Sequence, residues 1–202
     1  MIDLLATFIF FFTVIDPIGT IPVFIAVTAS SKEKLKKKIA LKAAVVAFFV
    51  LLFFLVVGEI ILDAIDIPLS TFQIAGGIVL FLFALTMIFG ESKPEEEVKM
   101  IDNASEKAIF PLAMPSIASP GAILAAIMLT ENSRHSIFEQ MQTAMVMLVV
   151  IVIAWLFMAF SARLFKYIGN GGASIISRVM GLILSAVAVS NILEGFSIYF
   201  NL

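Results

Sequence analysis

Two proline motifs interrupt apolar stretches of the sequence, and each carries groups that could bind a small solute. The first motif places Asp16 directly before Pro17, and the second places Ser119 directly before Pro120. Proline removes a backbone donor and breaks a helix, yet it is favoured as the first residue of a new helix. Asp and Ser are favoured caps in the preceding position. Each motif therefore predicts a helix that stops, is capped and starts again.

The restarted helices would present unpaired N–H groups and a partial positive charge of about half a unit. Two such ends suit an anionic group such as a carboxylate. Small residues around them leave room for only a modest substrate side chain, and glycines let the backbone approach a ligand. The predicted substrate-binding residues are Asp16, Pro17, Gly19, Thr20, Ser116, Ser119, Pro120 and Gly121. The alternative is that the prolines only kink the helices for packing.

Asp16 needs an explanation of its own, because a carboxylate at the centre of a membrane helix costs about 2.5–3.5 kcal/mol. Capping its own half-helix would offset that cost. Binding a substrate ammonium, a sodium ion or a transported proton is the functional alternative, and the two roles are compatible. Asn191 and Glu194 have the spacing of one helix face, and we expect them to support the site or its ion coupling.

The sequence offers little for an enzyme. It contains no cysteine and one histidine, His135, which falls in a polar loop. No HExxH motif, no nucleophile–base pair and no carboxylate pair occurs at a suitable depth. We therefore predict no catalytic residue, no metal site and no cofactor beyond a coupling proton or sodium ion.

The elements that must position these residues are membrane spans. Hydrophobic residues make up 61% of the 202 residues and charged residues 14%, against about 45–50% and about 25% in soluble domains. An all-α protein of one membrane domain, residues 1–202, follows. Its six predicted transmembrane helices are Leu4–Ala29, Ile39–Leu62, Phe72–Phe89, Ile109–Thr130, Thr143–Phe160 and Ile175–Phe200.

The basic residues predict one orientation. Twelve of the thirteen Lys and Arg residues lie in or beside the first, third and fifth loops, and only Arg134 lies in an even-numbered one. Cytoplasmic loops carry the excess of Lys and Arg. We expect a multi-pass protein of the cytoplasmic membrane with both termini outside.

The sequence also indicates an internal repeat. Pro17 and Pro120 are 103 residues apart, and Gly77 and Gly181 are 104 apart. We expect Gly76, Gly77 and Gly181 to be close helix-crossing points rather than ligand contacts. The predicted repeats cover residues 1–92 and 108–202, joined by a cytoplasmic linker at 93–107. Since each repeat has three spans, the second must be inverted relative to the first, with its broken helix fourth in the chain. Inverted repeats are typical of secondary transporters.

Three stretches together resemble the MarC family of integral membrane proteins over essentially the whole chain. They are Asp16–Pro22, Ala75-Gly76-Gly77 and Pro115–Ala122. The resemblance implies a six-span protein of the cytoplasmic membrane. It also implies a neutral amino-acid transporter acting on glycine, alanine and similar substrates. Ser119 stands where the family is expected often to have glycine.

We therefore expect a secondary transporter of small neutral amino acids that works by alternating access, in a direction the sequence leaves open. The alternative is a channel or facilitator for another small polar or anionic solute. The expected partners are an amino acid and the lipid bilayer. No basic patch with interleaved aromatic residues suggests nucleic acid, and a homo-oligomer is left open.

Overall fold

The computed structural model describes residues 3–29, 31–89, 106, 108–132 and 134–200, and every regular element among them is helical. The predicted linker at 93–107 lies outside the described residues, except for residue 106. The eight helical segments are α1 (Leu4–Ile15), α2 (Thr20–Val27), α3 (Glu33–Ala64), α4 (Leu69–Phe89), η1 (Ala108–Ile117), α7 (Pro120–Met128), α8 (Ile137–Ala159) and α9 (Ser161–Phe200).

Five helices are long and apolar enough to cross a membrane: Leu4–Val27, α3, α4, α8 and the Ser174–Phe200 part of α9. The pair η1 and α7, bent by 56°, makes a sixth span if it is counted as one. This agrees with the six predicted spans. The broken first and fourth helices are α1–α2 and η1–α7.

The outer surface of the bundle is apolar, as a lipid-facing surface must be. In α3 the exposed side chains recur every three or four residues, whereas small or aliphatic side chains on the other face are buried. The exposed row of α3 consists of Leu41, Val45, Phe49, Phe53, Val56 and Ile60. One face of α3 therefore contacts lipid and the other the protein core.

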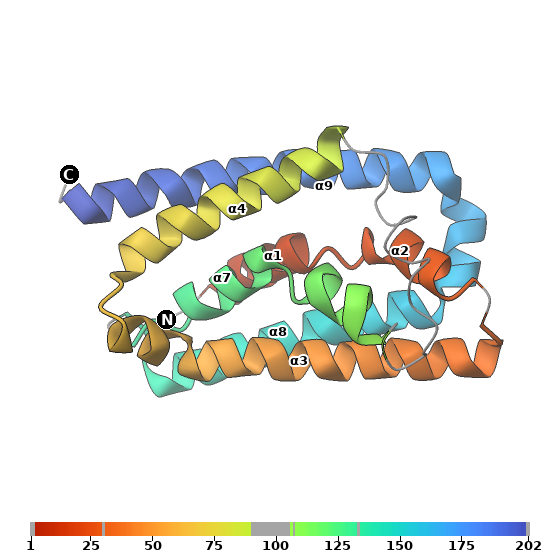
Figure 1. Ribbon diagram of the computed structural model, residues 1–202, viewed down its shortest axis with the longest axis horizontal. Helices are drawn as coiled ribbons and strands as arrows, with labels where there is room; N and C mark the ends of the chain where they lie inside the picture. Colours follow the sequence, from red (N-terminus) through yellow and green to blue (C-terminus); the bar gives the residue numbers. More distant parts are fainter. Residues whose placement is uncertain (1–2, 30, 90–105, 107, 133, 201–202) are drawn as a thin grey trace.

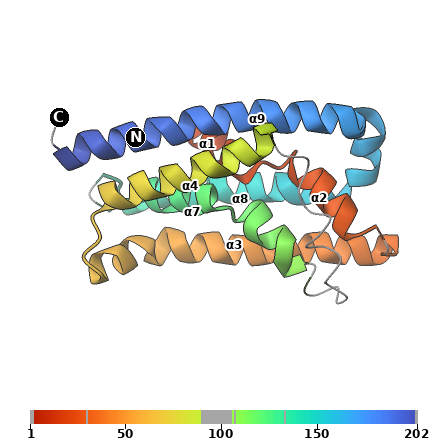
Figure 2. The same cartoon turned by 45° about the horizontal axis from the view of Figure 1, so that its top comes forward.

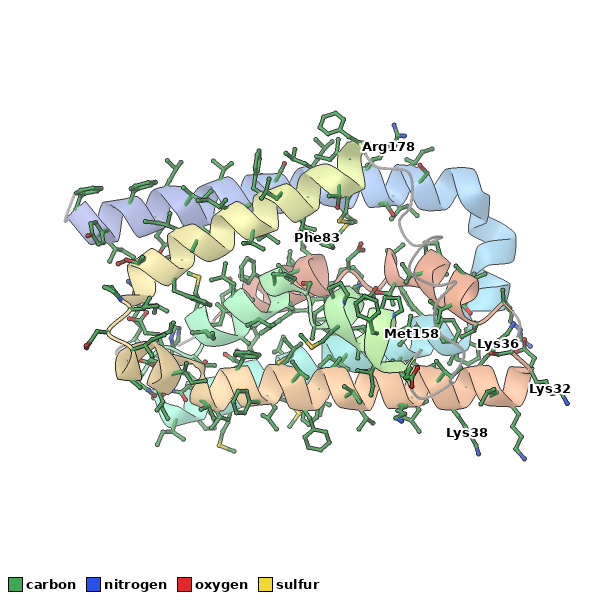
Figure 3. All side chains as sticks on the ribbon, viewed as in Figure 1. Lys32, Lys36, Lys38, Phe83, Met158 and Arg178 are labelled. Atoms are coloured by element: carbon green, nitrogen blue, oxygen red, sulfur yellow. The ribbon has the colours of Figure 1, made fainter. Side chains whose placement is uncertain are left out.

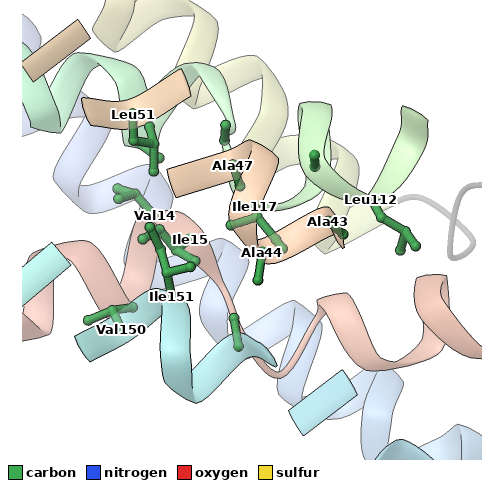
Figure 4. Close-up of a cluster of buried hydrophobic side chains, with 14 of the residues drawn as sticks. Val14, Ile15, Ala43, Ala44, Ala47, Leu51, Leu112, Ile117, Val150 and Ile151 are labelled. Carbon is green, nitrogen blue, oxygen red and sulfur yellow. The ribbon is translucent and has the colours of Figure 1, made fainter. Parts of the chain in front are cut away.

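Two helix pairs enclose the broken helices. α3 contacts α8, and α4 lies along α9 (Figures 1 and 2). The segments α1, α2, η1 and α7 occupy the space between these pairs. Buried aliphatic residues from α1, α3, η1 and α8 meet there, among them Ile15, Ala47, Ile117 and Ile151 (Figure 4). The broken helices are thus surrounded by protein.

Small residues let α4 and α9 approach closely, as predicted for Gly77 and Gly181. A Cβ added to Gly77 would lie 3.0 Å from the Ala188 carbonyl oxygen, and one added to Gly181 would lie 3.0 Å from the Ala84 carbonyl oxygen. Each of these glycines therefore lies directly against the backbone of the facing helix. Packing through small residues is the usual way in which membrane helices associate.

The glycine-rich stretch 163–174 lies between the fifth and sixth predicted spans, where we expected a loop, and it is instead part of α9. The chain is helical from Ser161 onward and changes direction at Gly169, whose φ of 63° and ψ of 176° suit glycine. The prediction of a loop was wrong because the glycine cluster breaks the helix at one residue only.

The two ends of the bundle differ in charge. The labelled Lys32, Lys36 and Lys38 lie at one end, which we call the lysine end (Figure 3). Both chain termini lie at the opposite end (Figure 1). The loop between α7 and α8 is also at that end, where its Asn132 N–H donates to Glu59 Oε2 of α3 over 2.8 Å. We call it the Arg134 end.

Candidate functional site

The first helix break lies at Asp16–Gly19. Asp16 ends α1 in the left-handed conformation, with φ 45° and ψ 67°, and its N–H donates to the Phe12 carbonyl. Its Oδ1 accepts the Gly19 N–H over 3.0 Å. The next helix, α2, begins at Thr20, whose hydroxyl and N–H both donate to the Asp16 carbonyl oxygen. The break was predicted correctly, but Asp16 caps a turn and α2 does not start at Pro17.

The Asp16 carboxylate also explains why residue 19 is a glycine. A Cβ at Gly19 would overlap Oδ2 of Asp16. The side chain that was expected to meet a ligand therefore lies over the Gly19 Cα in this structure. Asp16 itself is 7% exposed, and Pro17 is buried beside it.

The second break has the geometry that the sequence predicted. Ser119 is the N-cap of α7, its Oγ accepts the Ala122 N–H over 3.1 Å, and Pro120 is the first helical residue. The preceding segment η1 is distorted, with extended backbone at Phe110 and Met114. A half-buried Ser116 lies near its end. Local sequence was sufficient here, because an N-cap bond joins residues three apart.

A hydrogen bond joins the two breaks. The Ser119 hydroxyl donates to the Val14 carbonyl oxygen over 2.8 Å, across 105 residues of sequence. Val14 belongs to the last turn of α1, where carbonyl groups have no partner within the helix. The Ser119 side chain is fully buried, so one hydroxyl satisfies an orphan carbonyl of α1 and an orphan N–H of α7.

The broken helices contact each other in an antiparallel manner. α1 contacts α7, and α2 contacts η1. Val14, Asp16 and Ser119 thus lie in one buried region where four helix ends meet. The predicted residues of the two motifs are brought together at this point.

Gly121 faces protein rather than an open space. The side chain of Leu80 from α4 fills the position that a Cβ at Gly121 would take, and Leu124 of α7 lies against Gly76 in the same way. The two pairs interlock α4 with α7. Leu80 therefore covers Gly121 in this conformation, and the approach of Gly121 to a ligand stays a prediction.

The charge at the break is not balanced by a basic residue. Among the described residues, no Lys, Arg or His forms an ion pair with Asp16. Burying an unpaired carboxylate is costly, and the Gly19 N–H offsets only part of that cost. A cation, a proton or an ammonium group would offset the rest of that cost.

Asn191 and Glu194 do not join Asp16. Glu194 accepts the Gln73 amide over 3.1 Å and lies 3.7 Å from the Arg134 guanidinium. Asn191 is buried at 7% exposure, whereas the Glu194 side chain is 51% exposed. They belong to a polar cluster at the Arg134 end. Gln73, which the sequence offers only as a weaker candidate than Asn191 and Glu194, is the direct partner of Glu194.

Two further features bear on binding. Among the described residues, no group of three or more His, Cys, Asp or Glu side chains could hold a metal ion. His135 is half-buried, and its Nδ1 has no hydrogen-bond partner among those residues.

Comparison with known proteins gives one consistent result. Residues 1–200 match the model of a family described as MarC family integral membrane protein. A UPF0056 membrane protein of Archaeoglobus fulgidus is 31% identical over 95% of this chain and 91% of its own length. Another from Methanocaldococcus jannaschii is 36% identical over 91% of each chain. UPF0056 membrane protein YvbG of Bacillus subtilis is 34% identical over 93% of this chain and 91% of its own. No solved structure matches significantly.

Proposed function

The chain belongs to the MarC family of integral membrane proteins, and from this premise we propose that it is a secondary transporter of small neutral amino acids. The observation that carries the proposal is the junction of two helix breaks at Ser119 and Val14, beside buried Asp16. Irregular backbone at membrane depth is tolerated where it is buried in protein or lines a path for a polar solute. A junction of two broken helices is the kind of site at which carriers bind substrate.

The helix contacts support an inverted repeat of three spans. Let α1–α2 correspond to η1–α7, α3 to α8, and α4 to α9. When each helix is replaced by its counterpart in the other half, the α1–α8 contact becomes the η1–α3 contact, and the α2–α9 contact becomes the α7–α4 contact. All four contacts occur in the structure. The α3–α8 and α4–α9 contacts each turn into themselves. Two halves related in this way can exchange conformations, which is the basis of alternating access.

The substrate groups follow from the chemistry of the junction. The Asp16 carboxylate is the acceptor for an ammonium, and it has no basic partner among the described residues. The end of α7 at Ser119 is the position for a carboxylate. Leu80 and the Asp16 side chain now fill the spaces beside Gly121 and Gly19. Substrate therefore enters when α4 withdraws from α7, and the small space favours glycine or alanine.

We further propose that the lysine end faces the cytoplasm, which places both termini outside the cell. The support for this is the excess of Lys and Arg on one face, because cytoplasmic loops carry most of these residues. Because the chain has no cysteine, single cysteines report sidedness directly. A membrane-impermeant thiol reagent should label Leu4→Cys in intact cells and Lys38→Cys only after permeabilisation. The reverse pattern would invert the assignment.

Counterflow of labelled glycine and alanine in proteoliposomes tests the transport proposal. Asp16→Asn keeps the size of the side chain and removes the charge, whereas Asp63→Asn makes the same change at an exposed position. We expect saturable counterflow in the wild type and in Asp63→Asn, and its loss in Asp16→Asn. Absence of flux for every neutral amino acid tested would reject the substrate class. Flux that does not saturate would support a channel or facilitator instead.

A further inference from the structure

A second polar site lies at the Arg134 end, apart from the helix breaks. A cavity of about 50 Å³ is lined there by Ser70, Gln73, Glu131 and Arg134, together with three apolar side chains. We call it the Arg134 pocket. It lies where the first turns of α4 meet the loop after α7 and the end of α9. Arg134 is the one basic residue of the even-numbered loops.

The pocket presents both signs of charge. Arg134 Nε lies 3.0 Å from Glu131 Oε2, and Arg134 Nη1 lies 3.7 Å from Glu194 Oε1. Glu194 Oε2 in turn accepts the Gln73 amide over 3.1 Å. A guanidinium and carboxylates held this close together match the two charges of a zwitterion.

The ion pair between Arg134 and Glu194 is weak enough for a ligand carboxylate to replace Glu194. Its 3.7 Å is longer than a hydrogen bond, and the two side chains are 47% and 51% exposed. Exposed ion pairs contribute about 0–1 kcal/mol, so a ligand carboxylate can replace Glu194 on Arg134 at little cost. The released Glu194 then becomes an acceptor for the ammonium of the same ligand.

One buried amide lines the pocket, and a second lies on the same helix as Glu194. Gln73 is 2% exposed, and Asn191, one helical turn from Glu194, is 7% exposed. The Asn191 Nδ2 has no hydrogen-bond partner within the described part of the chain. Buried polar groups are nearly always paired, and an exception calls for an explanation. A polar ligand or water that reaches this level would supply the missing acceptor.

The size of the cavity limits the ligand. A cavity needs about 10–15 Å³ to hold each water, so this one accommodates about three to five waters. Glycine has five non-hydrogen atoms. The space therefore suits the smallest amino acids.

From these observations we propose that the Arg134 pocket is a second binding site for small zwitterions, with the ligand carboxylate on Arg134 and the ammonium on Glu194. The substrate class rests on the proposed function. The site is one that a solute meets before or after the central junction. The Arg134 pocket is connected to the junction by α7, because Arg134 follows the C-terminal end of that helix and Ser119 caps its N-terminal end.

Protection of an introduced cysteine tests the pocket. Ser70→Cys places a thiol in its wall, and Ile198→Cys is a second position that is 38% exposed. The rate of modification by a charged thiol reagent is measured in proteoliposomes with and without glycine. If bound protein does not react, glycine at about nine times its dissociation constant slows labelling about tenfold. If neither cysteine reacts, the pocket is closed to solutes and the proposal fails.

Two matched variants test whether Arg134 is responsible for the protection by glycine. Arg134→Gln should abolish it, whereas Arg178→Gln, an exposed change in the half of α9 nearer the lysine end, should leave it intact. Acetate and methylamine, each carrying one of the two charges, should protect less than glycine does. Protection that survives Arg134→Gln, or equal protection by acetate, would overturn the zwitterion site.

The same assay separates this proposal from the central one. In the Ser70→Cys background, Asp16→Asn should retain glycine protection, because the Arg134 pocket is a distinct site. Loss of protection in Asp16→Asn would mean that glycine acts through the junction, and the pocket would not be a binding site. Protection without counterflow in the wild type would reject the transport proposal and leave the pocket standing.

Discussion

Ser119→Ala is the substitution whose effect the structure defines best. It removes a single oxygen that is fully buried and makes two hydrogen bonds, one to the Val14 carbonyl and one from the Ala122 N–H. Loss of an N-cap side chain costs about 1 kcal/mol. A buried carbonyl left without a donor costs about 1–3 kcal/mol, and measured interhelical bonds in membranes lie at the lower end, at about 0.6–1.7 kcal/mol. We expect Ser119→Ala to lower the free energy of unfolding by about 1.6–2.7 kcal/mol.

The measurement is reversible unfolding of the purified protein in mixed micelles, followed by circular dichroism. Ser119→Gly separates the two bonds, because glycine is tolerated at an N-cap at a cost of only a few tenths of a kcal/mol. It still removes the bond to Val14. Ser185→Ala is the matched control, since that hydroxyl donates to the Leu182 carbonyl of its own helix.

The reasoning is refuted if Ser119→Ala destabilises the protein no more than Ser185→Ala does. The junction between the breaks would then contribute nothing to stability. If Ser119→Gly is as harmful as Ser119→Ala, the bond to Val14 dominates over the cap.

Three other substitutions, with Gly171→Ala as a control, test the packing and one set of hydrogen bonds. Gly19→Ala should abolish folded protein or transport in proteoliposomes, because its Cβ overlaps the Asp16 carboxylate; normal counterflow would contradict the turn described here. Gly77→Leu should destabilise the bundle by at least about 1–3 kcal/mol through overpacking against α9, whereas Gly171→Ala, with open space around it, should be neutral in the same unfolding assay. Thr130→Val should cost about 1 kcal/mol, because its buried hydroxyl lies 2.6 Å from the Ala126 carbonyl oxygen and 3.1 Å from the Leu55 carbonyl oxygen of α3; an unchanged unfolding midpoint would argue against a contribution of these bonds to stability.

Local chemistry was predictable from the sequence, and contacts distant in the chain were not. The Ser119 cap and Pro120 start were predicted because both depend on neighbours within a turn. Asp16 was predicted to be the N-cap of a helix that starts at Pro17, and that prediction was wrong. A left-handed residue followed by a short turn satisfies the same backbone groups as an N-cap does. The bond from Ser119 to Val14 depends on how two helices pack.

The glycines show the same limit. A glycine indicates that something comes close to the backbone, but it does not say what. Gly77 and Gly181 were expected to be helix crossings, and they are. Gly121 was expected to approach a ligand, and Leu80 lies there instead. The stretch around Gly169 was expected to be a loop, yet only that residue leaves the helix. Tertiary packing decides which neighbour fills each space.

The hydrogen bonds at the junction bear on how a carrier of this design could open. In this conformation the polar groups at the breaks are paired, Ser119 with Val14 across the junction and Asp16 with Gly19 within the first break. Separating the breaks without replacement would leave the Val14 carbonyl and the Ser119 hydroxyl without each other as partners, away from water, at a cost of about 1–3 kcal/mol each. A solute with both an ammonium and a carboxylate supplies one donor and one acceptor group, so it can replace the bonds as they break. An apolar solute of the same size cannot. On the proposed function, the breaks should therefore separate more readily with a zwitterion bound than when empty, which couples opening to the substrate.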